Sequence, residues 1–130
     1  MSMREPIIKT FIAGEDLSSY QYCFVKYSGA QGPNAAVVKA GANEKSCGIL
    51  QNAPASGEPA EVAIMGGGAM CKLGEASMSA GDLLTPTSAS TAEQVDADAE
   101  WCGAILEEDG TTGDVKAVYV TGFHNGKSDA

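Results

Sequence analysis

The apolar residues of this chain occur in short runs between turn residues, and this spacing constrains the fold more than any other feature. Sixteen glycines and five prolines interrupt the 130 residues, and the 3.6-residue periodicity of a helix is almost absent. A chain of this length fits one domain. We therefore predict a single all-β domain of the sandwich or barrel kind. The predicted strands are Tyr20–Tyr27, Ala35–Ala40, Cys47–Gln51, Glu61–Met65, Ala69–Leu73, Asp82–Thr85, Trp101–Leu106 and Val115–Thr121.

Two segments do not follow the simple alternation of a surface strand. In the first predicted strand, Tyr22 and Phe24 alternate with Cys23, Val25 and Tyr27, so both faces are apolar. Such a strand is covered on one face by the core and on the other by something else. The segment Thr91–Glu100 is predicted to form one or two helical turns.

The chain resembles itself at a displacement of 56 residues. The sequence Ile49-Leu50-Gln51 matches Ile105-Leu106-Glu107 (105 − 49), and Val62, Ile64 and Gly66 match Val118, Val120 and Gly122. Upstream, Ala13-Gly14-Glu15-Asp16-Leu17 resembles Ala80-Gly81-Asp82-Leu83 in a slipped register. One interpretation is two related units, 13–66 and 80–122. The other is that any two β-hairpins share turn glycines and β-branched strands.

The charge of the chain bears on its partners. Seventeen acidic residues against eight Lys and Arg give a formal net charge of −9, which opposes binding to nucleic acid or to anionic lipid. No apolar run approaches the roughly 20 residues that cross a bilayer, and the first residues do not form a signal peptide. We expect a protein made in the bacterial cytoplasm, with no direct nucleic-acid partner and no membrane partner.

The cysteines and acidic residues do not form a recognisable metal motif. Cys23, Cys47, Cys71 and Cys102 are far apart, without a C-x-x-C pair, so zinc binding is poorly supported. In a reducing compartment we expect them to be small buried hydrophobic residues. The acidic set Asp96, Asp98 and Glu100 lacks the central glycine and terminal glutamate of a calcium loop, and we interpret it as a solvated loop.

The chain also lacks a catalytic motif. The single histidine, His124, follows the last predicted strand in a polar tail, away from any predicted nucleophile. The run Gly66-Gly67-Gly68 has neither the spacing of a phosphate-binding loop nor a helix after it, so a sharp turn between two strands is predicted there. We expect no enzyme activity and no cofactor.

The N-terminal segment is unusually apolar for a free end. Ile7, Ile8, Phe11 and Ile12 follow Pro6, which favours an extended conformation. Two interpretations remain open: the segment is the first strand of the core of this chain, or it is an arm that packs on a neighbouring chain. The arm interpretation divides the chain into an arm, residues 1–12, a barrel domain, residues 13–122, and a polar tail, residues 123–130.

Several segments resemble the capsid cement, or decoration, proteins of tailed phages. The most specific is Gly48-Ile49-Leu50-Gln51-Asn52-Ala53-Pro54-Ala55-Ser56-Gly57-Glu58. The others are Phe11–Ser18, Gln21–Lys26 and Ala80–Leu84. The resemblance extends from about Phe11 to Val120. It departs from the family pattern at Cys47 and Cys102, where apolar or proline residues are expected, and in the tail after Gly122.

The resemblance implies a compact β-barrel or β-tulip-like domain and a virion protein without catalysis. Such a protein binds the major capsid protein on the outer surface of the expanded head, as a homotrimer at three-fold and quasi-three-fold positions, and stabilises the shell. Two alternative functions are a structural head-tail or tail component and a glycan-binding module on the virion, for which Trp101 and a few tyrosines are the available aromatic residues. The candidate capsid-binding residues are Ile7, Ile8, Phe11 and Ile12. The candidate subunit contacts are Tyr20, Tyr22 and Tyr27.

Overall fold

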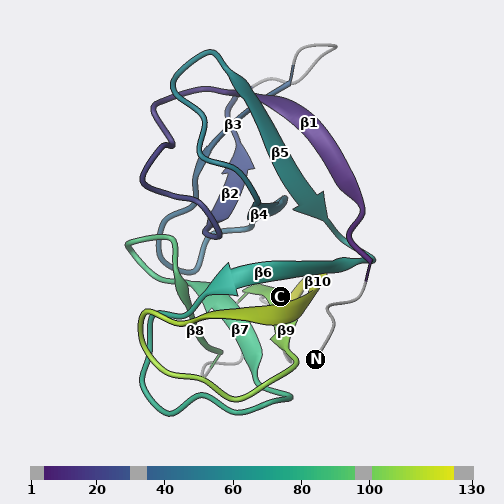
Figure 1. Ribbon diagram of the computed structural model, residues 1–130, viewed down its shortest axis with the longest axis vertical. Coiled ribbons are helices and arrows are strands. Elements are labelled where there is room, and N and C mark those ends of the chain that lie inside the picture. The colour runs from purple at the N-terminus through teal and green to yellow at the C-terminus, as the bar shows by residue number, and fades with distance from the viewer. Residues whose placement is uncertain (1–4, 30–34, 96–100, 125–130) are drawn as a thin grey trace, which may run out of the picture.

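The computed structural model describes residues 5–29, 35–95 and 101–124, which form ten strands and no helix (Figure 1). Every predicted run overlaps an observed strand, so the all-β prediction is confirmed. The helical turn predicted at Thr91–Glu100 is wrong at its start, where Ala92–Gln94 is a strand, and residues 96–100 lie outside the described part. The strands are β1 Ile8–Ala13, β2 Phe24–Tyr27, β3 Ala36–Lys39, β4 Gly48–Leu50, β5 Pro59–Ile64, β6 Gly68–Lys72, β7 Leu83–Pro86, β8 Ala92–Gln94, β9 Trp101–Leu106 and β10 Val115–His124.

The first five strands close into a barrel, which we call unit 1. Their order is β1-β3-β2-β4-β5, with β1 antiparallel to β5 and parallel to β3. Alternate residues of each strand point inward, and they form one apolar core. Its buried members are Phe11, Ala13, Leu17, Val25, Val37, Leu50, Ala60 and Val62.

The last five strands form a second sheet, which we call unit 2. Their order is β6-β10-β9-β7-β8, and a single parallel bridge between Leu73 and Ala92 joins the β6 end of the sheet to β8. The sheet therefore curls almost into a second barrel. Its interior holds Ala69, Cys71, Leu73, Met78, Leu84, Ala92, Ala104, Leu106, Val118 and Val120.

Units 1 and 2 have the same topology and the same strand register. The pair Ile49↔Ala63 between β4 and β5 has its equivalent in Ile105↔Tyr119 between β9 and β10, shifted by 56 on both strands. The remaining ladders correspond in the same way, with shifts of 60 for β1 and β6, 59 for β2 and β7, and 55 for β3 and β8. The chain therefore contains one five-stranded fold twice, over residues 8–64 and 68–124.

The connections repeat as well as the strands. Gly57 (φ 85°) and Gly113 (φ 90°) occupy equivalent turns, where a left-handed backbone favours glycine. One correction concerns the upstream match, because Gly14 is equivalent to Gly74 and not to Gly81. Their N–H groups donate to the equivalent carbonyls of Val37 and Ala92 at 2.8 and 2.7 Å.

The N-terminal segment is the first strand of the protein's own barrel. Residues 8–12 pair with residues 59–63 of β5, from Ile8↔Ala63 to Ile12↔Pro59. The arm boundary at residue 12 is therefore wrong, because the backbone N–H and C=O groups of this segment are satisfied within the sheet. At the other end, β10 continues through His124, so the first two residues of the predicted tail belong to a strand, and residues 125–130 lie outside the described part.

The strand with two apolar faces is covered by unit 2. In β2, Val25 points into unit 1, whereas Phe24 lies in the same buried cluster as the interior of unit 2. Ile49 and Ala63 accompany Phe24 in that cluster. The second cover predicted from the sequence therefore comes from the same chain, and Figure 1 shows unit 1 and unit 2 stacked on one another.

Candidate interaction surface

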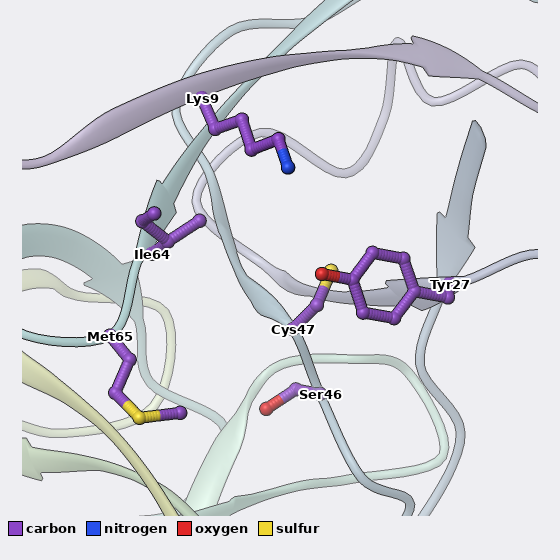
Figure 2. Close-up of a pocket in the computed structure, with 6 residues that line it drawn as sticks. All are labelled: Lys9, Tyr27, Ser46, Cys47, Ile64 and Met65. Carbon is purple, nitrogen blue, oxygen red and sulfur yellow. The ribbon is translucent and has the colours of Figure 1, made fainter. Parts of the chain in front are cut away.

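A pocket opens at one end of the unit 1 barrel (Figure 2). Its volume is about 290 Å³, and it is lined by Lys9, Tyr27, Ser46, Cys47, Ile64 and Met65. These residues come from β1, β2, β5 and the chain just before β4 and just after β5. We call the end marked by Lys9, Tyr27, Cys47 and Ile64 the mouth of unit 1.

The mouth of unit 1 is mainly apolar, with a few polar groups. The Lys9 ammonium lies 5.2 Å from the centre of the Phe11 ring, and Tyr27 packs edge-on against the same ring, with centroids 5.7 Å apart. Burial raises the pKa of the Cys47 thiol to about 11, and the charge of Lys9 opposes this shift only in part. The thiol is therefore neutral at pH 7, which suits contact with another surface better than nucleophilic chemistry.

Several large apolar side chains are exposed around the mouth and along β1. Met65 is 57% exposed, and Ile7, Ile8 and Ile12 are 46%, 43% and 37% exposed. Phe11 is only 3% exposed, because it points into the barrel. The candidate capsid-binding set is therefore corrected to the three isoleucines, which are accessible to a partner.

The three candidate tyrosines differ in their surroundings. Tyr27 is 50% exposed at the mouth. Tyr20 packs against the core of unit 1 and accepts a hydrogen bond from Lys39 Nζ at 3.1 Å, which raises the pKa of that lysine. Tyr22 has φ 69°, and its carbonyl accepts the N–H of Lys72 in unit 2 at 2.8 Å. Tyr22 therefore ties the two units together, and Tyr27 is the most accessible candidate for a subunit contact.

Most of the cysteines are buried, as predicted from the sequence. Cys23, Cys71 and Cys102 are buried and unpaired, and burial raises the pKa of the Cys23 and Cys71 thiols. Cys47 is the exception, because it is only partly buried at the mouth of unit 1. Trp101 is only partly exposed, and its Nε1 donates to Ser46 Oγ at 2.9 Å.

The described residues hold no cluster of metal ligands. Within residues 5–29, 35–95 and 101–124, no three His, Cys, Asp or Glu side chains converge as metal ligands. The acidic set Asp96, Asp98 and Glu100 lies outside these ranges. The part of the chain that the structure describes also contains no helix long and apolar enough to span a bilayer. In the run Gly66-Gly67-Gly68, the first two glycines lie in the predicted turn between β5 and β6, and Gly68 begins β6.

Sequence reasoning missed most of the pocket. Lys9, Cys47 and the pair Ile64-Met65 are distant in the chain, and only the closure of the barrel brings them together. A signal for the site was nevertheless present in the repeat. At the displacement of 56, the equivalent of Cys47 is Gly103, so a side chain that lines the pocket in unit 1 is replaced by glycine in unit 2. The strand registers add Ala69 as the equivalent of Lys9.

Comparison with known proteins identifies the fold. No protein-family model and no curated protein matches the chain. Among solved structures, the head fiber gp8.5 N base of bacteriophage phi29 superimposes with a TM-score of 0.69. The match covers 88% of this chain and 93% of that chain at 16% sequence identity. The two proteins therefore share the fold of both units over nearly their whole described length.

Proposed function

We propose that this protein is a non-enzymatic structural component of a tailed-phage head, which binds the outer surface of the shell and reinforces it. The observation that carries the proposal is the fold shared with a phage head fiber base over 88% of the chain. The cement-protein motif around Gly48–Glu58 points independently to the same class of virion protein. The partner is the major capsid protein, and the active form is a homotrimer at three-fold and quasi-three-fold positions.

The exposed apolar residues support an adhesive role. Ile8 and Ile12 project from the outer face of β1, and Ile7, which directly precedes β1, is also exposed. An apolar residue that is accessible in the free protein gains about 25 cal/mol for each Å² that a partner removes from water. A few such anchors account for most of the affinity of an interface. We therefore propose that Ile7, Ile8 and Ile12 contact the shell.

Reinforcement follows from mass action. A ligand that binds the intact shell and not its dissociated subunits stabilises the shell by RT ln(1 + [L]/Kd) for each site. A trimer that contacts several shell subunits at once also gains from multivalency, because loss of one contact leaves the others in place. Neither effect needs a catalytic group or a cofactor.

One alternative has a specific observation in its favour. The neighbour is named as the base of a head fiber, so this chain could equally form the base of an appendage on the head. An appendage base attaches to the shell without needing to strengthen it. Measuring whether binding makes the shell more stable therefore distinguishes the two functions.

The test uses heads purified from a phage strain that lacks the gene for this protein. Expanded heads are mixed with the pure protein, freed of excess protein by sedimentation, and heated while release of DNA is followed by dye fluorescence. We expect the protein to sediment with the heads and to raise the release temperature. Binding without a rise in temperature would favour the appendage base, and absence of binding would contradict both functions.

A further inference from the structure

The internal repeat shows how the mouth of a unit is covered. The mouth of unit 2, defined by the equivalent residues Ala69, Pro86, Gly103 and Val120, is buried. Ala69 and Val120 belong to the buried cluster that contains Phe24 of unit 1. The covering surface is a row across three neighbouring strands of unit 1, whose members are Phe24, Ile49 and Ala63.

The contact between Phe24 and Gly103 is very close. A Cβ added at Gly103 would lie 2.8 Å from Cε1 of Phe24, so a larger residue at this position would collide with the ring. Next to it, Asn43 N donates to the Pro86 carbonyl at 2.9 Å. Unit 1 thus fills the space in unit 2 that corresponds to the pocket in unit 1.

None of the residues that the structure describes covers the mouth of unit 1 in this way. Its pocket of about 290 Å³ stays open beside Lys9, Cys47 and Ile64 (Figure 2). The surface equivalent to the Phe24 row exists in unit 2 and consists of Leu83, Ile105 and Tyr119, which are neighbours across β7, β9 and β10. All three are partly exposed, whereas Phe24, Ile49 and Ala63 are fully buried.

We propose that the mouth of unit 1 binds the Leu83–Ile105–Tyr119 row of a second copy of this chain. The contact repeats between two copies the packing that joins unit 1 to unit 2 within one copy. It is head-to-tail, since each copy uses its mouth toward one neighbour and its row toward the other, and such contacts close into rings when the rotation permits. The inference rests on the homo-oligomeric part of the proposed function and gives it a subunit contact.

The contact predicts which residues meet. Phe24 lies against Gly103 within one copy, and the equivalents of these residues are Leu83 and Cys47. Leu83 of one copy should therefore lie against Cys47 of the next. Cys47 is the native cysteine suited to report this contact, because Cys23, Cys71 and Cys102 are buried.

The first test is a disulfide between copies. The Leu83→Cys variant is oxidised with diamide at pH 8, and its products are separated on a non-reducing gel. We expect covalent oligomers that disappear when Cys47→Ala is added. The Ile12→Cys variant is the matched control, because Ile12 lies on the outer face of β1, and it should form no disulfide with Cys47. A Leu83→Cys protein that stays monomeric, or that couples without Cys47, would overturn the inference.

The second test distinguishes a head-to-tail contact from a symmetric one. Met65→Asp damages the mouth, at a residue that is 57% exposed, and Ile105→Asp damages the row, at a residue that is partly exposed. Circular dichroism of each variant checks that it folds. Each variant alone should self-associate at least ~10-fold more weakly by analytical ultracentrifugation. An equimolar mixture retains one intact mouth and one intact row, so it should form 1:1 dimers and nothing larger.

The outcomes separate this inference from the function of the protein. A mixture that stays monomeric, or a wild-type protein that is monomeric at all concentrations, would contradict the head-to-tail contact. Ile12→Asp is the control, and it should leave self-association unchanged. All measurements use the pure protein without heads, so a failure here would leave the binding of the protein to heads standing.

Discussion

Units 1 and 2 build the same barrel topology around different interiors. Phe11 of unit 1 is replaced by Cys71 in unit 2 and Val37 by Ala92, whereas Val25 is replaced by the larger Leu84. Some core positions thus have a smaller side chain in unit 2 and others a larger one. Cores tolerate such substitutions when the total volume and the hydrophobic pattern are kept. The comparison teaches that this fold is specified by strand register and turns more than by any one core side chain.

The two mouths differ more than the two interiors. Small residues at the mouth of unit 2, such as Gly103, admit Phe24, whereas Cys47 and Lys9 line an open pocket in unit 1. The mouth of unit 2 therefore holds a side chain of unit 1. Substitutions at equivalent positions of the two units can therefore serve as controls for each other.

The largest effect is expected at Phe24, which joins the two units. Phe24→Ala should lower the free energy of unfolding by about 3–5 kcal/mol, since the ring is fully buried. Leu83→Ala, at the equivalent and partly exposed position, should cost less than about 1.5 kcal/mol in the monomer. Urea unfolding at low protein concentration measures both, and equal losses would break the comparison.

The next effect concerns the close approach at the mouth of unit 2. Gly103→Ala should cost about 1–3 kcal/mol, because its Cβ would meet both Phe24 and Ser46, which are themselves buried. Cys47→Ala at the equivalent position removes one partly exposed sulfur, and should cost less than about 1 kcal/mol. Thermal unfolding measures the stability of both variants. A Gly103→Ala protein as stable as wild type would contradict the close packing of Phe24 on the mouth of unit 2.

An intermediate effect is expected at the paired turns. Gly57→Ala and Gly113→Ala each place a side chain on a left-handed backbone with open space around it. Each should destabilise the protein by about 1–2 kcal/mol through the backbone alone. Losses of similar size in urea unfolding would sharpen the equivalence of the turns, and a clear inequality would weaken it.

The smallest effect involves an ion pair that unit 2 lacks. Lys26 Nζ lies 2.8 Å from Glu44 Oε1, whereas the equivalent of Lys26 is Thr85. Hydrogen bonds from Lys26 and from the Gly41 N–H lower the pKa of Glu44 from its usual 4.5. The pair therefore adds stability above pH 4.5 that is lost as pH falls through the lowered pKa.

The Glu44→Gln variant measures that contribution. Both side chains are about one-third or more exposed, so the loss at pH 7 should be below about 1 kcal/mol. The difference from wild type should shrink as the pH is lowered from 5 to 3. A difference that stays constant across this range would assign it to packing and not to charge.

Part of this architecture was predictable from sequence. The β4–β5 and β9–β10 hairpins keep one displacement of 56, so a comparison without gaps finds them. The other strands of unit 2 are displaced from their equivalents in unit 1 by 55, 59 and 60 residues, because the connecting loops differ in length. Such shifts hide the repeat and produced the false match of Gly14 with Gly81.

The remaining errors have a common physical cause. Whether Ile8–Ala13 is a strand of the core or an arm depends on whether β5 offers a free edge, and the sequence of the segment does not contain that information. Ala92–Gln94 is a short strand held by β7 on one side and by the Gly74 N–H on the other. In both places tertiary pairing decides the conformation, and local propensity does not.

The most direct measurement of the central claim is electron cryomicroscopy of the purified virion that carries this protein. The account predicts density for both units on the outside of the head at three-fold and quasi-three-fold positions. In that density, the mouth of unit 1 in each copy faces the Leu83–Ile105–Tyr119 row of the next copy. A virion whose outer surface carries no density for this protein would contradict the account.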